Sequence, residues 1–292
     1  MADIAVIGAG YVGLTTGTCL AHLGHNVTIA DIDEIKVQKL SEGEVTIFEP
    51  GLSELLTQGI ENGNLKFVVG ATSASRNAAF HFLCLPTPPN PDGSTNMEYF
   101  SSAIEEIKDI LPPNSVIVNK STLPVGTASQ LKKQIQRTDV EIVSNPEFLS
   151  EGNAVQDFLQ PSRIVIGAES QEAASSVAEL FKDIDTTTQI TGTESAELIK
   201  HTANAFLAMK LTFINEIATL CELVGANVLD VAEGIGYDPR IGSTYLRPGP
   251  RWGGSCFPKD SSSLLQTANK AGFDFELLEK AITLNQKHLQ RT

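Results

Sequence analysis

Residues 253–260, Gly-Gly-Ser-Cys-Phe-Pro-Lys-Asp, could do covalent chemistry. Cys256 follows a flexible glycine pair, so a ligand could approach its sulfur closely. The thiolate is the nucleophilic form of cysteine, and positive charge nearby favours it. Lys259 could supply that charge, and Asp260 could supply a polar partner. The stretch therefore predicts a nucleophilic cysteine in a polar loop.

Residues 8–13, Gly-Ala-Gly-Tyr-Val-Gly, form a second pattern, which predicts dinucleotide binding. An apolar strand precedes the pattern, a helix follows it, and a second strand completes a βαβ unit of about 30 residues. Gly8, Gly10 and Gly13 allow, in that order, the tight turn, the close approach of a pyrophosphate and the packing of strand on helix.

Asp31 lies at the end of the second strand, where its carboxylate could accept hydrogen bonds from ribose hydroxyls. With no arginine next to it, this carboxylate would repel a 2′-phosphate. NAD is therefore favoured over NADP, and FAD, which uses the same fingerprint, is the alternative.

The rest of the chain alternates between strands and helices up to about residue 192. Apolar runs predict strands over 4–7, 26–30, 66–69, 80–85, 115–118, 140–143 and 163–167, and helices lie between them, notably over 97–111 and 171–182. We therefore expect an α/β domain over 1–192, built as a doubly wound, Rossmann-like parallel sheet.

The pattern changes at Thr193, because residues 193–224 contain neither proline nor glycine. They predict one long helix, with Glu194 and Glu197 favouring its positive end. Further helices are expected over 227–234, 260–271 and from 276 onward. We expect an all-α domain over 193–292, with the chain ending within the last helix.

Polar residues follow several predicted strands, at the edge where ligands bind to parallel sheets. Ser121 and Thr122 could hold a water molecule or cap the next helix. Glu147 and Glu151 could do acid–base work or act as surface charges and caps. The loop over 86–93 could bind a ligand or be a rigid surface loop.

Lys200 and Asn204 are four residues apart on the long helix and so share one face. They could donate hydrogen bonds to an oxyanion in a cleft. The alternative is that both residues lie on a solvated face.

The formal charge of −14, from 21 basic and 35 acidic residues, argues against nucleic acid as a partner. The four cysteines have neither metal-ligand nor disulfide spacing, which favours a reducing compartment, and no histidine spacing suggests a metal site. Neither a signal peptide nor a membrane-spanning stretch is visible. We therefore expect a cytoplasmic enzyme without a metal.

Taken together, these motifs resemble the UDP-glucose/GDP-mannose dehydrogenase family. They occur in the family's order over nearly the whole chain, at residues 8–13, 48–52, 84–88, 121–127, 145–152, 200–206, 240–242 and 253–260. Phe-Glu-Pro-Gly-Leu and Cys-Phe-Pro-Lys-Asp look most like UDP-glucose 6-dehydrogenases.

The resemblance implies a four-electron oxidation of a nucleotide-sugar C6 hydroxyl by two NAD+, through a thiohemiacetal and a thioester on Cys256. It assigns oxyanion stabilisation to Lys200 and Asn204, water positioning and proton transfer to Asp260 and Thr122, and thioester hydrolysis to Glu147.

The resemblance also implies binding residues. Those implied for the cofactor are Gly8, Gly10, Tyr11, Val12, Gly13, Asp31, Pro86, Thr87, Ser121, Thr122 and Glu151. Those implied for the sugar nucleotide are Phe148, Leu149, Lys200, Asn204, Tyr245, Leu246, Gly249 and Gly253, with Arg240 reaching the substrate of the other subunit in a homodimer.

Two departures from the family pattern stand out. Arg251 replaces a common glycine, and the third, C-terminal domain that closes over UDP is missing, which predicts a truncated chain with weakened substrate binding. The alternatives are a GDP-mannose 6-dehydrogenase, a dehydrogenase of small hydroxy acids that uses no cysteine, and an NAD-binding or dimerisation fragment with little activity.

Overall fold

The computed structural model describes residues 1–290, and the chain divides into two compact units. The first unit contains Met1–Pro88 and Asn96–Lys200, and the second contains Pro89–Thr95 and the part that begins at His201. The long helix therefore starts in the first unit and continues in the second. The predicted domain boundary near residue 192 stays a prediction.

The first unit is an eight-stranded sheet with strand order β3-β2-β1-β4-β5-β6-β7-β8. The strands are β1 (Asp3–Ile7), β2 (Asn26–Asp31), β3 (Leu65–Val69), β4 (Phe80–Leu83), β5 (Val116–Asn119), β6 (Glu141–Ser144), β7 (Ile164–Ala168) and β8 (Thr188–Thr191). All neighbours pair in parallel except β6 and β7, which pair antiparallel. The doubly wound α/β fold is confirmed, with one reversed pair that the sequence did not indicate.

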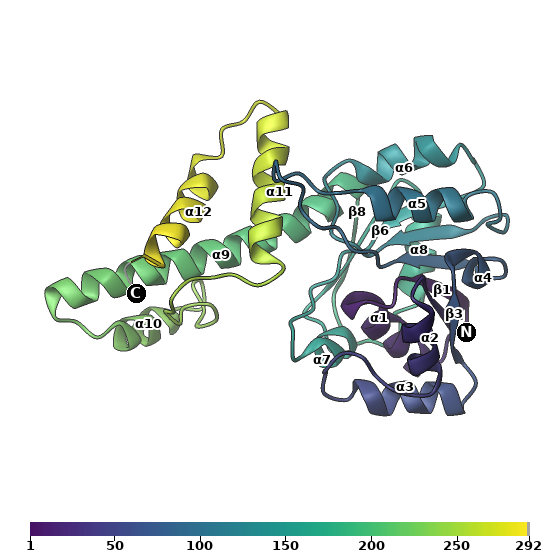
Figure 1. Ribbon diagram of the computed structural model, residues 1–292. Coiled ribbons are helices and arrows are strands. Elements are labelled where there is room, and N and C mark those ends of the chain that lie inside the picture. The colour runs from purple at the N-terminus through teal and green to yellow at the C-terminus, as the bar shows by residue number, and fades with distance from the viewer. Residues whose placement is uncertain (291–292) are drawn as a thin grey trace. The chain divides into compact units, whose positions relative to one another are not determined.

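Helices cover both faces of this sheet (Figure 1). Apolar residues of α1 (Tyr11–His22), α2 (Glu34–Ser41), α3 (Leu52–Glu61), α7 (Ala154–Leu159) and α8 (Gln171–Glu179) belong to one core cluster. Those of α4 (Ala71–Ser75), α5 (Glu98–Ile107) and α6 (Thr127–Ile135) belong to another. Because both faces are covered, central strands such as β1 and β4 read as continuous apolar runs.

The second unit is helical, as expected. It contains most of α9 (Thr193–Val224), with α10 (Val228–Gly236), α11 (Phe257–Lys270) and α12 (Glu276–His288). Ala205, Leu264 and Leu278 form the small core in which α9, α11 and α12 meet. Helix α12 ends at His288, so the predicted continuation to the last residue is wrong for 289–290, and 291–292 lie outside the described residues.

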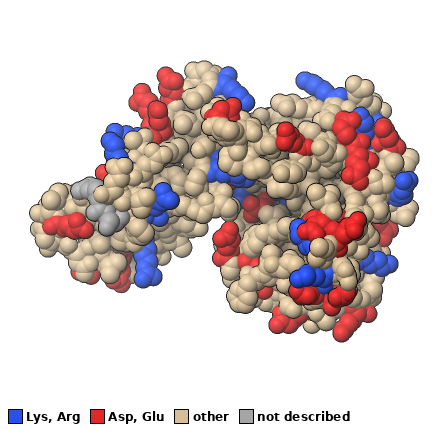
Figure 2. Space-filling model, viewed as in Figure 1, with Lys and Arg blue, Asp and Glu red and all other residues tan. Residues whose placement is uncertain are grey.

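No helix within residues 1–290 is long and apolar enough to cross a membrane. Figure 2 shows acidic and basic side chains interspersed over the face in view. The cytoplasmic location stays a prediction.

Candidate active site

The glycine-rich turn between β1 and α1 leaves room for a dinucleotide. A Cβ at Gly8 would lie 2.5 Å from the Cys84 carbonyl oxygen, and one at Gly13 would lie 1.8 Å from that of Gly8. At Gly10, by contrast, a Cβ would meet nothing within 4 Å. Packing within the chain therefore requires Gly8 and Gly13, whereas Gly10 borders open space at the N-terminus of α1. That is where a pyrophosphate would bind.

Asp31 ends β2 beside this turn, and its carboxylate is well supplied with donors. The backbone N–H groups of Ala9 and Asp33 donate to it at 2.9 and 3.0 Å, and Lys36 Nζ lies 3.1 Å from Oδ2. Burial alone would raise the pKa of Asp31, but these partners hold it below its usual value.

Lys36 was not foreseen from the sequence. It puts a cation beside Asp31, so the charge of Asp31 alone does not explain a preference for NAD over NADP. The only signal in the sequence was a lysine five residues after the acid.

The strand-end segments after β4 and β5 contact one another. Ser121 Oγ accepts from the Leu85 N–H at 2.8 Å, and Thr87 Oγ1 donates to the Thr122 carbonyl at 3.1 Å. The structure thus brings Pro86 and Thr87 together with Ser121 and Thr122 at the carboxyl edge of the sheet, the edge at which parallel sheets bind ligands.

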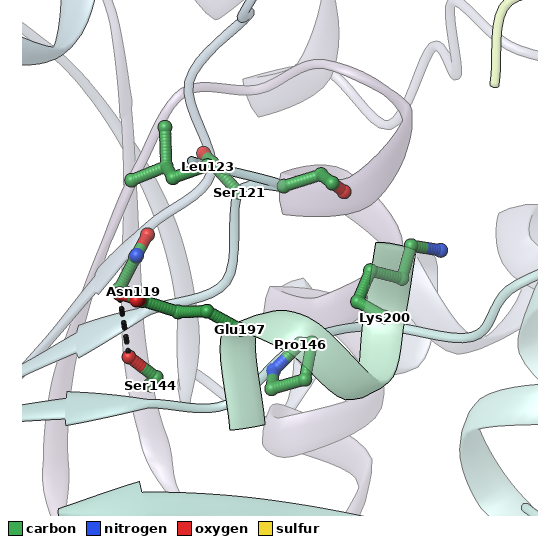
Figure 3. A pocket seen from close by; sticks show the side chains of 8 residues that line it. Asn119, Ser121, Leu123, Ser144, Pro146, Glu197 and Lys200 are labelled. Carbon is green, nitrogen blue, oxygen red and sulfur yellow. Dashed lines mark hydrogen bonds between the residues drawn. The ribbon is translucent and has the colours of Figure 1, made fainter. Parts of the chain in front are cut away.

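A small cavity of about 10 Å³, roughly the size of one water molecule, lies at this edge (Figure 3). Thr122 and Lys200 both line it, together with Asn119, Ser121, Leu123, Ser144, Pro146 and Glu197. Glu197 and Lys200 leave α9 in different directions in this view, and Glu197 reaches Ser144. The cavity therefore joins two of the predicted catalytic side chains.

Glu197 was expected to act at the positive end of its own helix, but it accepts hydrogen bonds at the start of α6. The backbone N–H groups of Gly126 and Ala128 donate to its carboxylate at 2.6 and 3.0 Å. Burial raises the pKa of Glu197 to about 6. The residue fixes the first turns of α9 against the segment that carries Thr122.

Lys200 and Glu147 form a buried ion pair, with Nζ 2.8 Å from Oε1 and side chains that are 4% and 8% exposed. The Leu149 N–H donates to the second Glu147 oxygen at 2.7 Å. Burial alone would raise the pKa of Glu147, but the Lys200 ammonium holds it below its usual value. The alternative of a solvated face for Lys200 and Asn204 is wrong, because both are buried.

Lys120 is a second buried cation near this pair, and no sequence motif singled it out. Its ammonium donates to Asn145 Oδ1 at 2.9 Å and lies 5.7 Å from the centre of the Phe158 ring. Burial lowers the pKa of Lys120 to about 8, against the opposing effects of Cys84 and Glu147. The sequence offered one signal for this residue, a lysine directly after the apolar run that forms β5.

In the second unit, Asn204 and Asp260 are brought together. Asn204 Nδ2 donates to Asp260 Oδ2 at 2.5 Å, and the other Asp260 oxygen lies 3.7 Å from Lys259 Nζ. The Asp260 side chain is almost completely buried, at 1% exposed. The pairing of Asn204 with Asp260 was not anticipated.

Cys256 is exposed, whereas Cys19, Cys84 and Cys221 are buried. It lies at the N-cap of α11, which begins at Phe257, three residues earlier than expected, so Lys259 and Asp260 belong to the first turn of a helix. The Asp260 N–H donates to the Cys256 carbonyl at 2.8 Å. The thiol is therefore accessible and held at a helix start.

The loop before Cys256 is anchored by Trp252, another residue that the sequence did not flag. Its indole N–H donates to Thr212 Oγ1 at 2.8 Å, and its backbone exchanges two hydrogen bonds of 2.9 Å with the Asn285 side chain. These contacts tie Trp252, at the start of this loop, to α9 and α12. Gly253 comes directly after the anchor.

The residues expected to bind the substrate lie in different environments, some buried and some exposed. Phe148 stacks beneath Arg163, whose guanidinium carbon is 3.8 Å from the ring centre, and Leu149 follows it. The Tyr245 ring packs edge-on against Phe257, Leu246 is buried, and the Gly249 N–H donates to Asn215. Arg240 is exposed and paired with Asp238.

Within residues 1–290, no three His, Cys, Asp or Glu side chains are grouped so that they could hold a metal ion. The fold and the fingerprint together define a dinucleotide-binding α/β protein with a helical second part.

The chain belongs to the UDP-glucose/GDP-mannose dehydrogenase family. The NAD binding domain of that family matches residues 2–185, and its central domain matches residues 194–287. The prediction of NAD as the cofactor and the resemblance stated from the motifs are thereby confirmed.

Known relatives cover nearly all of this chain. UDP-glucose 6-dehydrogenase TuaD of Bacillus subtilis is 44% identical over 98% of this chain and 63% of its own length. The solved UDP-glucose dehydrogenase of Pyrobaculum islandicum is 34% identical, with a TM-score of 0.92 over 98% of this chain and 68% of its own.

The solved UDP-D-ManNAc dehydrogenase of Pyrococcus horikoshii is 26% identical, with a TM-score of 0.90 over 98% of this chain and 68% of its own. The chain covers 63% of the length of the Bacillus relative, which is just under two thirds.

Proposed function

We propose that the chain is the NAD-binding and central part of an enzyme that oxidises the C6 hydroxyl of a nucleotide sugar, with UDP-glucose as the substrate. The observation that carries the proposal is an accessible thiol, Cys256, on a chain that also has a buried Lys200–Glu147 pair and the NAD fingerprint. NAD+ accepts a hydride in each of the two oxidations.

In the first oxidation, the sugar C6–OH loses a hydride and a proton and becomes an aldehyde. The Cys256 thiolate then adds to the aldehyde carbon, and the oxygen gains negative charge in a thiohemiacetal. The amide of Asn204 and the ammonium of Lys200 stabilise that oxygen by hydrogen bonding. Negative charge that develops beside Cys256 also lies at the favourable end of α11.

The second hydride loss turns the thiohemiacetal into a thioester. Water then attacks the thioester carbon, the C–S bond breaks, and carboxylate and free thiol are released. Glu147 takes a proton from the attacking water, and Thr122, which borders a cavity of about 10 Å³, helps to position that water. Because Glu147 is ionised and hydrogen-bonded, it can accept this proton.

We also propose that two copies associate through α9. Phe206, Phe213 and Leu220 recur every seven residues on this helix, and their side chains are 57%, 54% and 52% exposed. Large apolar side chains repeated on one face are typical of an interaction surface. A second copy of the chain would cover this face with an equivalent one.

The test counts NADH formed per sugar consumed for UDP-glucose, GDP-mannose and UDP-N-acetylmannosamine, with the chain as it stands and with Cys256→Ser. We expect two NADH per UDP-glucose in the parent protein. The variant should form no uronate, yet keep its NAD+ affinity, measured by calorimetry as the control. A variant that still forms uronate would exclude the thioester route, and NADH formation only with another sugar would exclude UDP-glucose.

A further inference from the structure

Glu49 is a buried carboxylate that the proposed chemistry does not use. It is 7% exposed, although its neighbour Phe48 is 93% exposed, and it lies in the connection between α2 and α3. Burying a carboxylate costs free energy unless hydrogen bonds compensate for the lost water. The hydrogen-bond partners of Glu49 therefore indicate its role.

Three donors from two distant segments meet at this carboxylate. Tyr11 Oη donates to Oε1 at 2.7 Å, the Gly152 N–H donates to the same oxygen at 2.6 Å, and the Ala154 N–H donates to Oε2 at 2.9 Å. Burial alone would raise the pKa of Glu49, but these donors hold it below its usual value. The carboxylate thus joins the dinucleotide fingerprint to the segment after β6.

Tyr11 adds a second link to the same segment. Its hydroxyl also lies 2.9 Å from the Ser150 carbonyl oxygen, and one hydroxyl proton is shared between that oxygen and Glu49. Tyr11 is the first residue of α1, directly after Gly10. Its side chain therefore connects the start of this helix to residues 147–152.

Residues 147–152 are consequently held at both ends, with additional contacts from Phe148 to Arg163 and from the Ser150 N–H to Asp157. At one end Glu147 pairs with Lys200, and at the other Ser150 and Gly152 contact Tyr11 and Glu49. Loss of the second attachment would leave the Gly152 and Ala154 N–H groups without their acceptor, while Glu147, Phe148 and Ser150 keep their contacts with Lys200, Arg163 and Asp157.

We propose that Glu49, together with Tyr11, is a positioning residue that holds the loop carrying Glu147 and Phe148 in its reactive place. Glu49 does not touch the substrate, and its effect is exerted through residues 147–152. The inference rests on the proposed function for its effect on turnover, but the effect on the loop is independent of any activity.

The test compares Glu49→Gln, Tyr11→Phe and the double variant with Glu54→Gln, a matched control at an exposed position of α3. Glutamine keeps the size of the side chain but loses one acceptor oxygen, so at least one of the three donors loses its partner. Three quantities are measured: amide hydrogen exchange over 147–154, the NAD+ dissociation constant, and kcat and KM with UDP-glucose.

For Glu49→Gln we expect exchange at Gly152 and Ala154 to be about tenfold faster and kcat about tenfold lower, as for the loss of one charge-assisted hydrogen bond. The NAD+ dissociation constant should stay within about twofold, because the fingerprint backbone is unchanged. Tyr11→Phe should act in the same direction more weakly, and the double variant should lose less than the sum of the two single variants, because they share the Tyr11–Glu49 hydrogen bond. Glu54→Gln should match the parent protein.

Unchanged exchange in Glu49→Gln would overturn the inference, and so would faster exchange with unchanged kcat. If Glu49→Gln does not fold, Tyr11→Phe decides in the same way, because it keeps the carboxylate and both backbone donors. If the parent protein forms no NADH with any nucleotide sugar, the proposed function fails, and the exchange rates alone decide whether Glu49 positions the loop.

Discussion

Replacing Lys200 with methionine removes one charge from the buried pair while keeping a side chain of similar length. Lys200 Nζ and Glu147 Oε1 are 2.8 Å apart, and both side chains are more than nine-tenths buried. Removing one partner of such a pair typically costs about 3–5 kcal/mol, because the other charge is left without compensation. We expect the lower end, about 3 kcal/mol, since the Leu149 N–H and Lys120 still favour the carboxylate.

The pH dependence of this loss has a defined sign. In the parent protein the folded-state pKa of Glu147 lies below its ordinary value. Its stabilising contribution is thus present above the unfolded pKa, about 4.3, and is lost as the pH falls through the folded one. Without Lys200, burial raises the folded pKa, so the variant loses stability as the pH rises from about 4.3.

The difference between variant and parent should therefore be large at pH 7.5 and should narrow toward pH 5. Urea unfolding at the two pH values measures it. Glu147→Gln/Lys200→Met should recover most of the loss, because no charge is then buried unpaired. Lys182→Met, which breaks the exposed pair with Glu179, is the control and should leave the free energy of unfolding essentially unchanged, because solvent screens that pair. A loss below about 1 kcal/mol at pH 7.5 for Lys200→Met would refute the reasoning.

Two further predictions concern the fingerprint and the proposed dimer. Gly13→Ala should cost about 3 kcal/mol or more in unfolding free energy, because its Cβ would lie 1.8 Å from the Gly8 carbonyl oxygen. Gly10→Ala should change that free energy by less than about 1 kcal/mol, but it should weaken NAD+ binding, measured by calorimetry, by roughly tenfold or more. Equal losses of unfolding free energy in the two variants would contradict this view of the turn. Phe213→Asp should shift sedimentation toward the monomer, with Tyr99→Asp on α5 as the control. If the parent protein itself sediments as a monomer, the proposal of a dimer is wrong.

Local patterns were enough to predict most of the fold. Buried parallel strands such as β1 and β4 read as apolar runs, and the glycine spacing marks the turn before α1. The edge strand β8, Thr-Gln-Ile-Thr, was missed because it is mostly exposed and polar. The antiparallel pairing of β6 with β7 was also missed, since strand direction depends on contacts that no local pattern encodes.

The candidate site divides in the same way. Cys256, Lys200 and Asn204 carry distinctive chemistry at informative spacings, so they could be selected from the sequence. The helix α11 begins three residues before the predicted start, because the stretch up to Asp260 was interpreted as a polar loop, whereas proline is well tolerated in the first turn of a helix. Lys120 and Trp252 act through partners far away in the chain, which only the fold brings near. Lys36 lies five residues after its partner Asp31, but no local pattern says that the first turn of α2 returns its side chain to the end of β2.

The contrast between one exposed and three buried cysteines also has a practical consequence. A maleimide dye should attach to a single defined position in the native protein, without any engineered cysteine. The Cys256 sulfur would also be the first to be oxidised in air, either to sulfenic acid or to a disulfide with another molecule. Purification without a reductant could therefore give a preparation whose lost turnover reflects a blocked thiol rather than an inert fold.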